Sequence, residues 1–154
     1  MKGRQAAGLA LLVGAVILVA ALAAFPARAQ IWTASDGTAG YAVAGDYTGL
    51  SFRCGPDGIA MIFSGFPGKL QDGGGYTVGV SVDGTAFLYE ATARAGEADG
   101  TSILVSRGAP AGLAELIAAL RKGRSVEISG PAGRYTVPLT GSGKALDKLR
   151  QTCG

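Results

Sequence analysis

The sequence contains no histidine and only two cysteines, Cys54 and Cys153. Without histidine, the chain cannot build a Ser-His-Asp triad or the imidazole metal sites that many enzymes use. If the two cysteines are oxidised, no thiolate nucleophile remains, and the chain has no GxSxG motif. The composition therefore predicts a protein that is not an enzyme, with no catalytic residue, no cofactor and no metal site.

An excess of positive charge is also missing from most of the chain. The 154 residues carry a formal charge of +3, from 14 Lys and Arg against 11 Asp and Glu. Three of the basic residues, Lys2, Arg4 and Arg28, lie before Gln30, so residues 30–154 hold equal numbers of basic and acidic side chains. A neutral domain has no net charge with which to attract nucleic acid or an anionic membrane. We therefore expect neither as a partner.

The sequence has no complete phosphate-binding loop. Gly141-Ser142-Gly143-Lys144 precedes a helical pattern, but Pro138 stands where a P-loop has its first glycine. Ala145 replaces the hydroxyl residue that would hold Mg²⁺. We interpret this segment as a turn in which Ser142 caps the helix, with small-anion binding at the helix N-terminus as the alternative.

The acidic residues follow a turn pattern rather than the pattern of a catalytic pair. Aspartate directly before glycine is typical of tight turns. Carboxylate catalysis or calcium binding by these loops is the alternative, although no EF-hand spacing is present. The aspartates of this kind are Asp57, Asp72, Asp83 and Asp99.

The first 29 residues have the pattern of an export signal. A basic start is followed by the uncharged, apolar run Ala6–Phe25 and by Ala27-Arg28-Ala29, an A-x-A cleavage site. Residues 1–29 are therefore predicted to be a signal peptide, with Gln30 as the first mature residue. The protein would then be periplasmic or secreted, with no membrane contact after cleavage. The alternative is an inner-membrane anchor formed by uncleaved Ala6–Phe25.

The segment Leu50–Ser64 reads as a β-hairpin that carries the first cysteine. Cys54 alternates in phase with Phe52, which predicts that both face the core. Cys153 shares one face of a C-terminal helical pattern with Leu149. Because both cysteines point inward and the compartment is oxidising, we predict a Cys54–Cys153 disulfide, with two free buried thiols as the alternative. Such a bridge closes a loop of about 100 residues and would stabilise the fold by about 4–5 kcal/mol.

Most of the remaining chain reads as short strands separated by glycine-rich turns. Tyr76–Val82 alternates apolar and small or polar residues, and Asp83-Gly84 after it is typical of a two-residue hairpin turn. Two stretches change to a helical period, at about 110–122 and 142–150. We therefore predict a single, mainly β domain over residues 30–154, an antiparallel β-sandwich with these two short helices. The other expected strands are 59–63, 85–92, 101–106, 125–129 and 135–139, with one or two more in 31–47.

Two aromatic residues are candidates for partner recognition. Trp32 lies near the mature N-terminus, outside the clear strand patterns, and Phe66 lies in a predicted loop. The alternative is that both rings pack at the ends of the sandwich.

The order of landmarks resembles the type VI secretion-associated VasI/TagO-like family of exported bacterial proteins. The similarity includes an early tryptophan, LSFRC at 50–54, VSVDG at 80–84, GRSVEIS at 123–129, YTVPLTGSGKALDKL at 135–149 and Cys153. Small exported proteins of the invasion-associated locus B type end in a similar strand and helix. The resemblance implies a non-enzymatic accessory module of the bacterial envelope, which binds an unknown protein or envelope component. A secreted inhibitor of a lysozyme or protease is the alternative.

Overall fold

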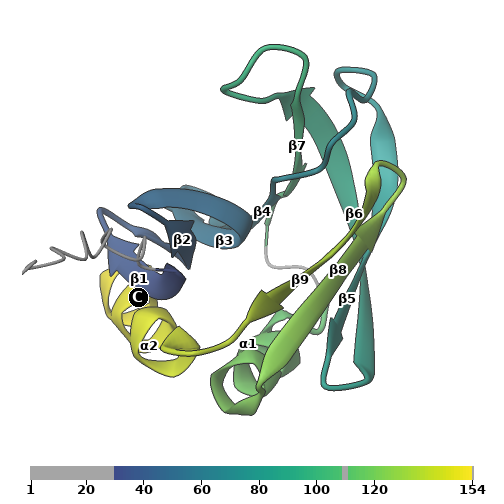
Figure 1. Cartoon of the computed structure of the whole chain (residues 1–154). Coiled ribbons are helices and arrows are strands. Elements are labelled where there is room, and N and C mark those ends of the chain that lie inside the picture. The colour runs from purple at the N-terminus through teal and green to yellow at the C-terminus, as the bar shows by residue number, and fades with distance from the viewer. Residues whose placement is uncertain (1–29, 109–110, 154) are drawn as a thin grey trace, which may run out of the picture.

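The computed structural model describes residues 30–108 and 111–153. Within them the chain forms nine strands and two helices (Figure 1). The predicted signal peptide, residues 1–29, lies outside the described residues. In order, the elements are β1 Gln30–Ser35, β2 Thr38–Val43, β3 Asp46–Gly55, β4 Gly58–Phe63, β5 Gly75–Val82, β6 Thr85–Ala95, β7 Ser102–Ser106, α1 Leu113–Lys122, β8 Ser125–Gly130, β9 Gly133–Pro138 and α2 Ser142–Cys153.

All nine strands belong to one antiparallel sheet. The order across the sheet is β1-β2-β3-β4-β7-β6-β5-β8-β9, and the sheet curls into a half-barrel (Figure 1). The prediction of a mainly β, antiparallel fold with two short helices is confirmed. The predicted sandwich is not: the strands described here form one continuous, curled sheet instead of two stacked sheets. A strongly curled sheet buries its concave face against itself and its helices, so the same alternating pattern suits both architectures.

The predicted hairpin turns are present. Asp83 and Gly84 both have positive φ, 45° and 93°, as a type I′ turn between β5 and β6 requires. Val78, Val80 and Val82 face the core on β5, and the residues between them face outward. β3 and β4 pair from Leu50–Phe63 to Gly55–Gly58 around the predicted turn.

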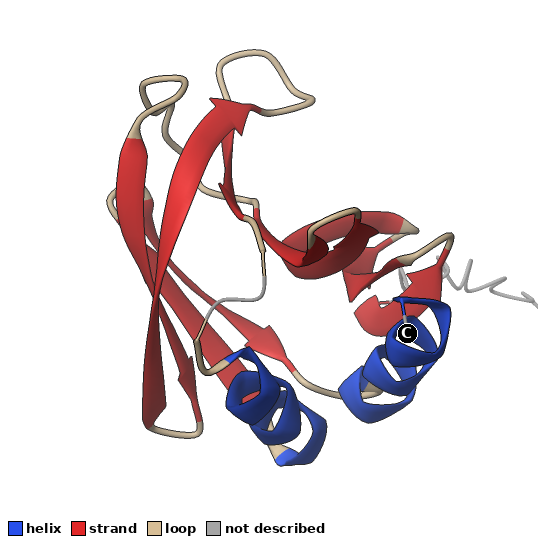
Figure 2. Cartoon of the chain, turned by 180° about the vertical axis from the view of Figure 1, so that it is seen from behind, coloured by secondary structure: helices blue, strands red, loops and turns tan. Residues whose placement is uncertain are grey.

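The two helices cover the concave side of the curl (Figure 2). The buried stripe of α1 consists of Leu113, Leu116, Ile117 and Leu120. α2 packs on β1, β2 and β3 and also touches α1. Ser142 does not cap α2 as predicted. Its hydroxyl instead donates a hydrogen bond of 2.6 Å to the carbonyl of Leu120 and so joins the two helices. The predicted start of the first helix at residue 110 lies outside the described residues.

Contacts across the concave face hold the two halves of the half-barrel together. The Trp32 indole Nε1–H donates to the Pro138 carbonyl over 2.8 Å and links β1 to the end of β9. The Tyr135 hydroxyl donates to the Gly49 carbonyl over 2.7 Å and links β9 to β3. These hydrogen bonds connect residues that are 106 and 86 positions apart in the chain.

The predicted disulfide joins Cys54 to Cys153, with 5.4 Å between the two Cα atoms. It connects the end of β3 to the last turn of α2, between residues that are 99 positions apart in the sequence. The helix that lies over β1–β3 is therefore covalently attached to the sheet that it covers. In the described ranges, no helix is long and apolar enough to cross a membrane.

Candidate functional site

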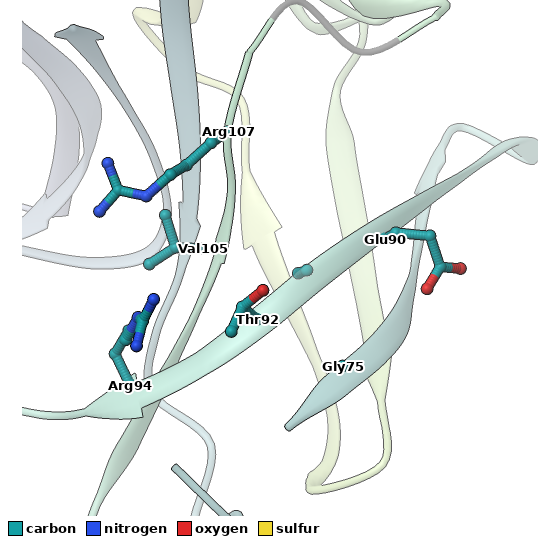
Figure 3. Close-up of a pocket in the computed structure, with 7 residues that line it drawn as sticks. Gly75, Glu90, Thr92, Arg94, Val105 and Arg107 are labelled. Carbon is teal, nitrogen blue, oxygen red and sulfur yellow. The ribbon is translucent and has the colours of Figure 1, made fainter. Parts of the chain in front are cut away.

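The outer, convex face of the sheet carries a hollow of about 320 Å³ over β5, β6 and β7 (Figure 3). We call it the arginine hollow, because two arginines stand on one side of it. Its lining residues are Gly75, Glu90, Ala91, Thr92, Arg94, Val105 and Arg107.

The register of the three strands brings these residues together. Gly75 of β5 pairs with Thr92 of β6, and Thr92 pairs with Val105 of β7, so the three form one row across the sheet. Successive side chains of a strand point to opposite faces, so Arg94 lies on the same outer face as Thr92. Arg107 follows Val105 by two residues, just beyond the end of β7.

The two arginines have no charged partner in the part of the chain that the structure describes. The ion pairs found there join Arg121 to Asp147 over 2.8 Å and Arg134 to Glu127 over 3.7 Å. Figure 3 shows the guanidinium groups of Arg94 and Arg107 on the same side of the hollow, with Val105 between them. In the register of β6 and β7, Arg94 lies opposite Ile103 and Arg107 continues β7 in the other direction, so the two arginines flank the Thr92–Val105 pair from opposite ends. Two positive charges at one hollow favour an anion.

Glu90, the acidic residue of the lining, makes no ion pair with either arginine. Glu90 accepts a hydrogen bond of 2.7 Å from the Thr77 hydroxyl on β5. In Figure 3 its carboxylate points away from both guanidinium groups. The hollow therefore presents two cations and the Thr92 hydroxyl on one side, and a carboxylate already held by Thr77 on the other. Such donors can bind and orient an oxyanion.

A second, wider hollow of about 580 Å³ lies beside α1 and has a mainly apolar lining. Ile59 and Arg150 contribute to it from β4 and α2. Its other arginine, Arg121, is already paired with Asp147. The arginine hollow is the better candidate site, because two arginines line it and neither makes an ion pair in the part of the chain that the structure describes.

The two candidate recognition residues, Trp32 and Phe66, lie in the core. Each residue is 3% exposed. The Trp32 ring packs near Phe52, with 6.5 Å between ring centroids, and Phe66 meets Tyr135 edge-to-face at 5.1 Å. This burial leaves little of either ring for a partner to contact.

Sequence reasoning missed Arg94 and Arg107. The expected strand ended at residue 92 and left Arg94 unassigned, whereas β6 continues to Ala95 and pairs with β7. Nothing local in the sequence distinguishes these two arginines from other surface charges. A correct pairing of 92–95 with 102–105 was the signal needed to bring them together.

In residues 30–108 and 111–153, no three His, Cys, Asp or Glu side chains gather closely enough to hold a metal ion.

Among the aspartates predicted to form turns, Asp83 accepts hydrogen bonds from two backbone N–H groups. Hydrogen bonds from the backbone N–H groups of Arg124 and Ser125 hold the pKa of Asp83 below its usual value, although partial desolvation opposes them.

The fold and the hollow together define a β-rich, disulfide-linked protein with a cationic depression on the convex face of its sheet. No protein-family model matches the sequence, and no curated protein matches it. Among solved structures, invasion associated protein B from Bartonella henselae matches with 18% identity and a TM-score of 0.36, over 70% of this chain and 95% of that chain. That protein belongs to the second type named in the sequence analysis. At this TM-score the match carries no functional argument, and the resemblance to the VasI/TagO-like family stays a prediction.

Proposed function

We propose that this chain is an exported, non-enzymatic binding module of the bacterial envelope, which contacts an envelope component or protein through the arginine hollow. The observation that carries the proposal is that Arg94 and Arg107 both line one depression and that neither makes an ion pair within the described residues. Binding sites combine a concave surface with a few convergent polar groups, and this hollow has both.

The position of the hollow suits recognition. Except for Arg107, which directly follows β7, its residues lie on three paired strands, where backbone hydrogen bonds hold them in place. The disulfide supports an oxidising compartment, because disulfides persist mainly in exported proteins. We place the protein in the periplasm or outside the cell, with anchoring by uncleaved Ala6–Phe25 as the alternative.

The first test is export. We expect the full chain, expressed in a bacterial host, to be recovered from the periplasmic fraction with Gln30 as its N-terminal residue. Recovery from the cytoplasm with the first 29 residues attached would contradict the proposal. Recovery from the inner membrane with those residues attached would favour the anchored alternative.

The second test is binding to envelope material. The exported protein is mixed with washed envelope fractions and sedimented, and the bound share is compared between variants. We expect Arg94→Gln/Arg107→Gln to bind at least about tenfold less, because each charge-assisted hydrogen bond contributes about 1.5–3 kcal/mol.

The matched control is Lys122→Gln/Lys144→Gln, which removes the same charge from α1 and α2. Both lysines are exposed, and in the described ranges neither makes an ion pair. Equal binding by the wild-type protein and the arginine variant would exclude the arginine hollow as the contact surface.

A further inference from the structure

We propose that the arginine hollow binds a phosphate group that carries a double negative charge, as inorganic phosphate and phosphate monoesters do. This inference rests on the proposed function and specifies its ligand. It follows from the space at Gly75, from the charges at Arg94 and Arg107, and from the hydroxyl of Thr92.

Gly75 provides the space for a ligand. A Cβ atom added there would meet no heavy atom within 4 Å. Several other glycines also face open space, but they have positive φ, which a turn requires, whereas Gly75 does not. The backbone at Gly75 would thus accept a side chain, and a strand position normally carries one. Gly75 is the first residue of β5 and pairs with Thr92, so its missing side chain leaves the outer face open beside the Thr92 hydroxyl.

The charges select the ligand. Arg94 and Arg107 together carry two positive charges on one side of the hollow (Figure 3). A phosphate monoester carries up to two negative charges at neutral pH and has three terminal oxygens, whereas a carboxylate has one charge and two oxygens. A guanidinium group can donate two parallel hydrogen bonds to such oxygens. The hydroxyl of Thr92, in the row between Gly75 and Val105, adds a further donor.

The negative charge of Glu90 lowers the affinity of the hollow for phosphate, so removing that charge should raise the affinity. Its carboxylate stands at the rim and would repel an anion, although it points away from the arginines and is held by Thr77. Glu90→Gln should therefore strengthen phosphate binding by about twofold to threefold through the loss of one like charge.

The test is an NMR titration of the isotopically labelled exported protein with inorganic phosphate. Chemical-shift changes are expected at the amides of Gly75, Thr92 and Val105. Arg94→Gln and Arg107→Gln should each weaken binding about tenfold, and Lys122→Gln/Lys144→Gln should leave it unchanged. Higher salt should weaken binding, because the arginines are exposed.

A variant that fills the hollow without changing its charge tests whether phosphate binding needs the open space. Gly75→Val keeps both arginines and suits a strand, and its Cβ would meet no atom within 4 Å, so the protein should fold with unchanged or higher stability. It fills the open space and should reduce phosphate binding at least about tenfold. Wild-type affinity in Gly75→Val, confirmed as folded by its NMR spectrum, would overturn the proposal.

Further binding experiments show whether the phosphate group comes from a lipid or a soluble molecule, and whether a carboxylate can replace it. Glycerol phosphate should bind like inorganic phosphate. Phosphatidylcholine vesicles that contain phosphatidic acid, compared with vesicles that lack it, test whether a lipid can present the group. Binding of the former vesicles alone would identify a lipid source, and binding of glycerol phosphate without vesicle binding would identify a soluble one. Acetate that binds as tightly as phosphate, or phosphate that shifts no signal of the hollow, would overturn the phosphate assignment.

The two proposals fail in different ways. If phosphate does not bind but Arg94→Gln/Arg107→Gln still loses envelope binding, the ligand class is wrong and the proposed function stands. If phosphate binds in the hollow but the same variant sediments with envelopes as the wild type does, the anion site stands and the proposed function is wrong.

Discussion

Gly49 lies on β3 directly beneath two side chains of β9. Its φ is +75°, a conformation that side-chain-bearing residues rarely adopt. A Cβ atom added there would approach Val137 Cγ2 to 2.8 Å and Tyr135 Cε2 to 3.3 Å. The missing side chain thus lets β9 approach β3 across the curl, and the Tyr135 hydroxyl donates a hydrogen bond to the Gly49 carbonyl at this contact.

Substitution at Gly49 should therefore cost more than substitution at another left-handed glycine. Gly45 has φ +98° and no atom within 4 Å of an added Cβ, so Gly45→Ala should lose only about 1–2 kcal/mol of unfolding free energy through backbone strain. Gly49→Ala adds overpacking and should lose about 2–5 kcal/mol. Urea denaturation of both variants measures the difference. Equal losses would show that β9 does not press on Gly49.

At the scale of the elements, two tyrosines attach strands to more distant parts of the fold. The Tyr89 hydroxyl donates to the Gly112 carbonyl over 3.2 Å and ties β6 to the start of α1. Tyr135 ties β9 to β3. Burial raises the pKa of Tyr89 from 10.0 to about 12, with a smaller contribution from the Glu115 carboxylate. Burial also raises the pKa of Tyr135 well above its ordinary value.

These shifts predict alkaline unfolding. The folded state favours the neutral phenols, so their contribution to stability is complete below pH 10, the pKa in the unfolded chain, and is lost as the pH rises toward 12. The unfolding free energy should fall steadily over this range, and phenolate absorbance should rise in step with loss of the near-ultraviolet circular dichroism.

The variant Tyr89→Phe/Tyr135→Phe tests the cause. It should be less stable at pH 7, because two carbonyls lose a hydrogen bond, yet its stability should decline less between pH 10 and 12 than that of the wild type. A decline as steep as that of the wild type would assign the alkaline loss to other groups.

At the scale of the whole molecule, one covalent bond and one curled sheet set the architecture. The bridge from Cys54 to Cys153 spans 99 residues and fastens α2 to β3. α2 also contacts β1, β2 and α1, so this C-terminal helix covers the part of the sheet formed by β1–β3 (Figure 1). Removing the disulfide leaves these contacts of the folded state in place but increases the conformational entropy of the unfolded chain.

The variant Cys54→Ser/Cys153→Ser should therefore keep the fold and lose about 4–5 kcal/mol of unfolding free energy, the loss of loop-closure entropy for about 100 residues. Urea denaturation measures the loss. Dithiothreitol should destabilise the wild type by a similar amount and leave the serine variant unchanged. Non-reducing mass spectrometry of the wild type should find no free thiol, and two free thiols would contradict the disulfide.

The sequence by itself determined the local structure. Alternating side chains and turn residues predicted most strands, the Asp83-Gly84 turn and both helices, because these depend on neighbours within a few residues. The inward phase of Cys54 and of Cys153, together with the predicted export signal, was also enough to predict the disulfide.

Only the tertiary structure decided the arrangement of these elements. Alternation shows that a strand has one buried face but not what covers it, so one curled sheet and a two-sheet sandwich have the same pattern. Burial of Trp32 and Phe66 follows from contacts with distant residues. Arg94 and Arg107 meet because residues 92–95 pair with 102–105, and a long-range register of this kind is a property of the assembled sheet and not of any one segment.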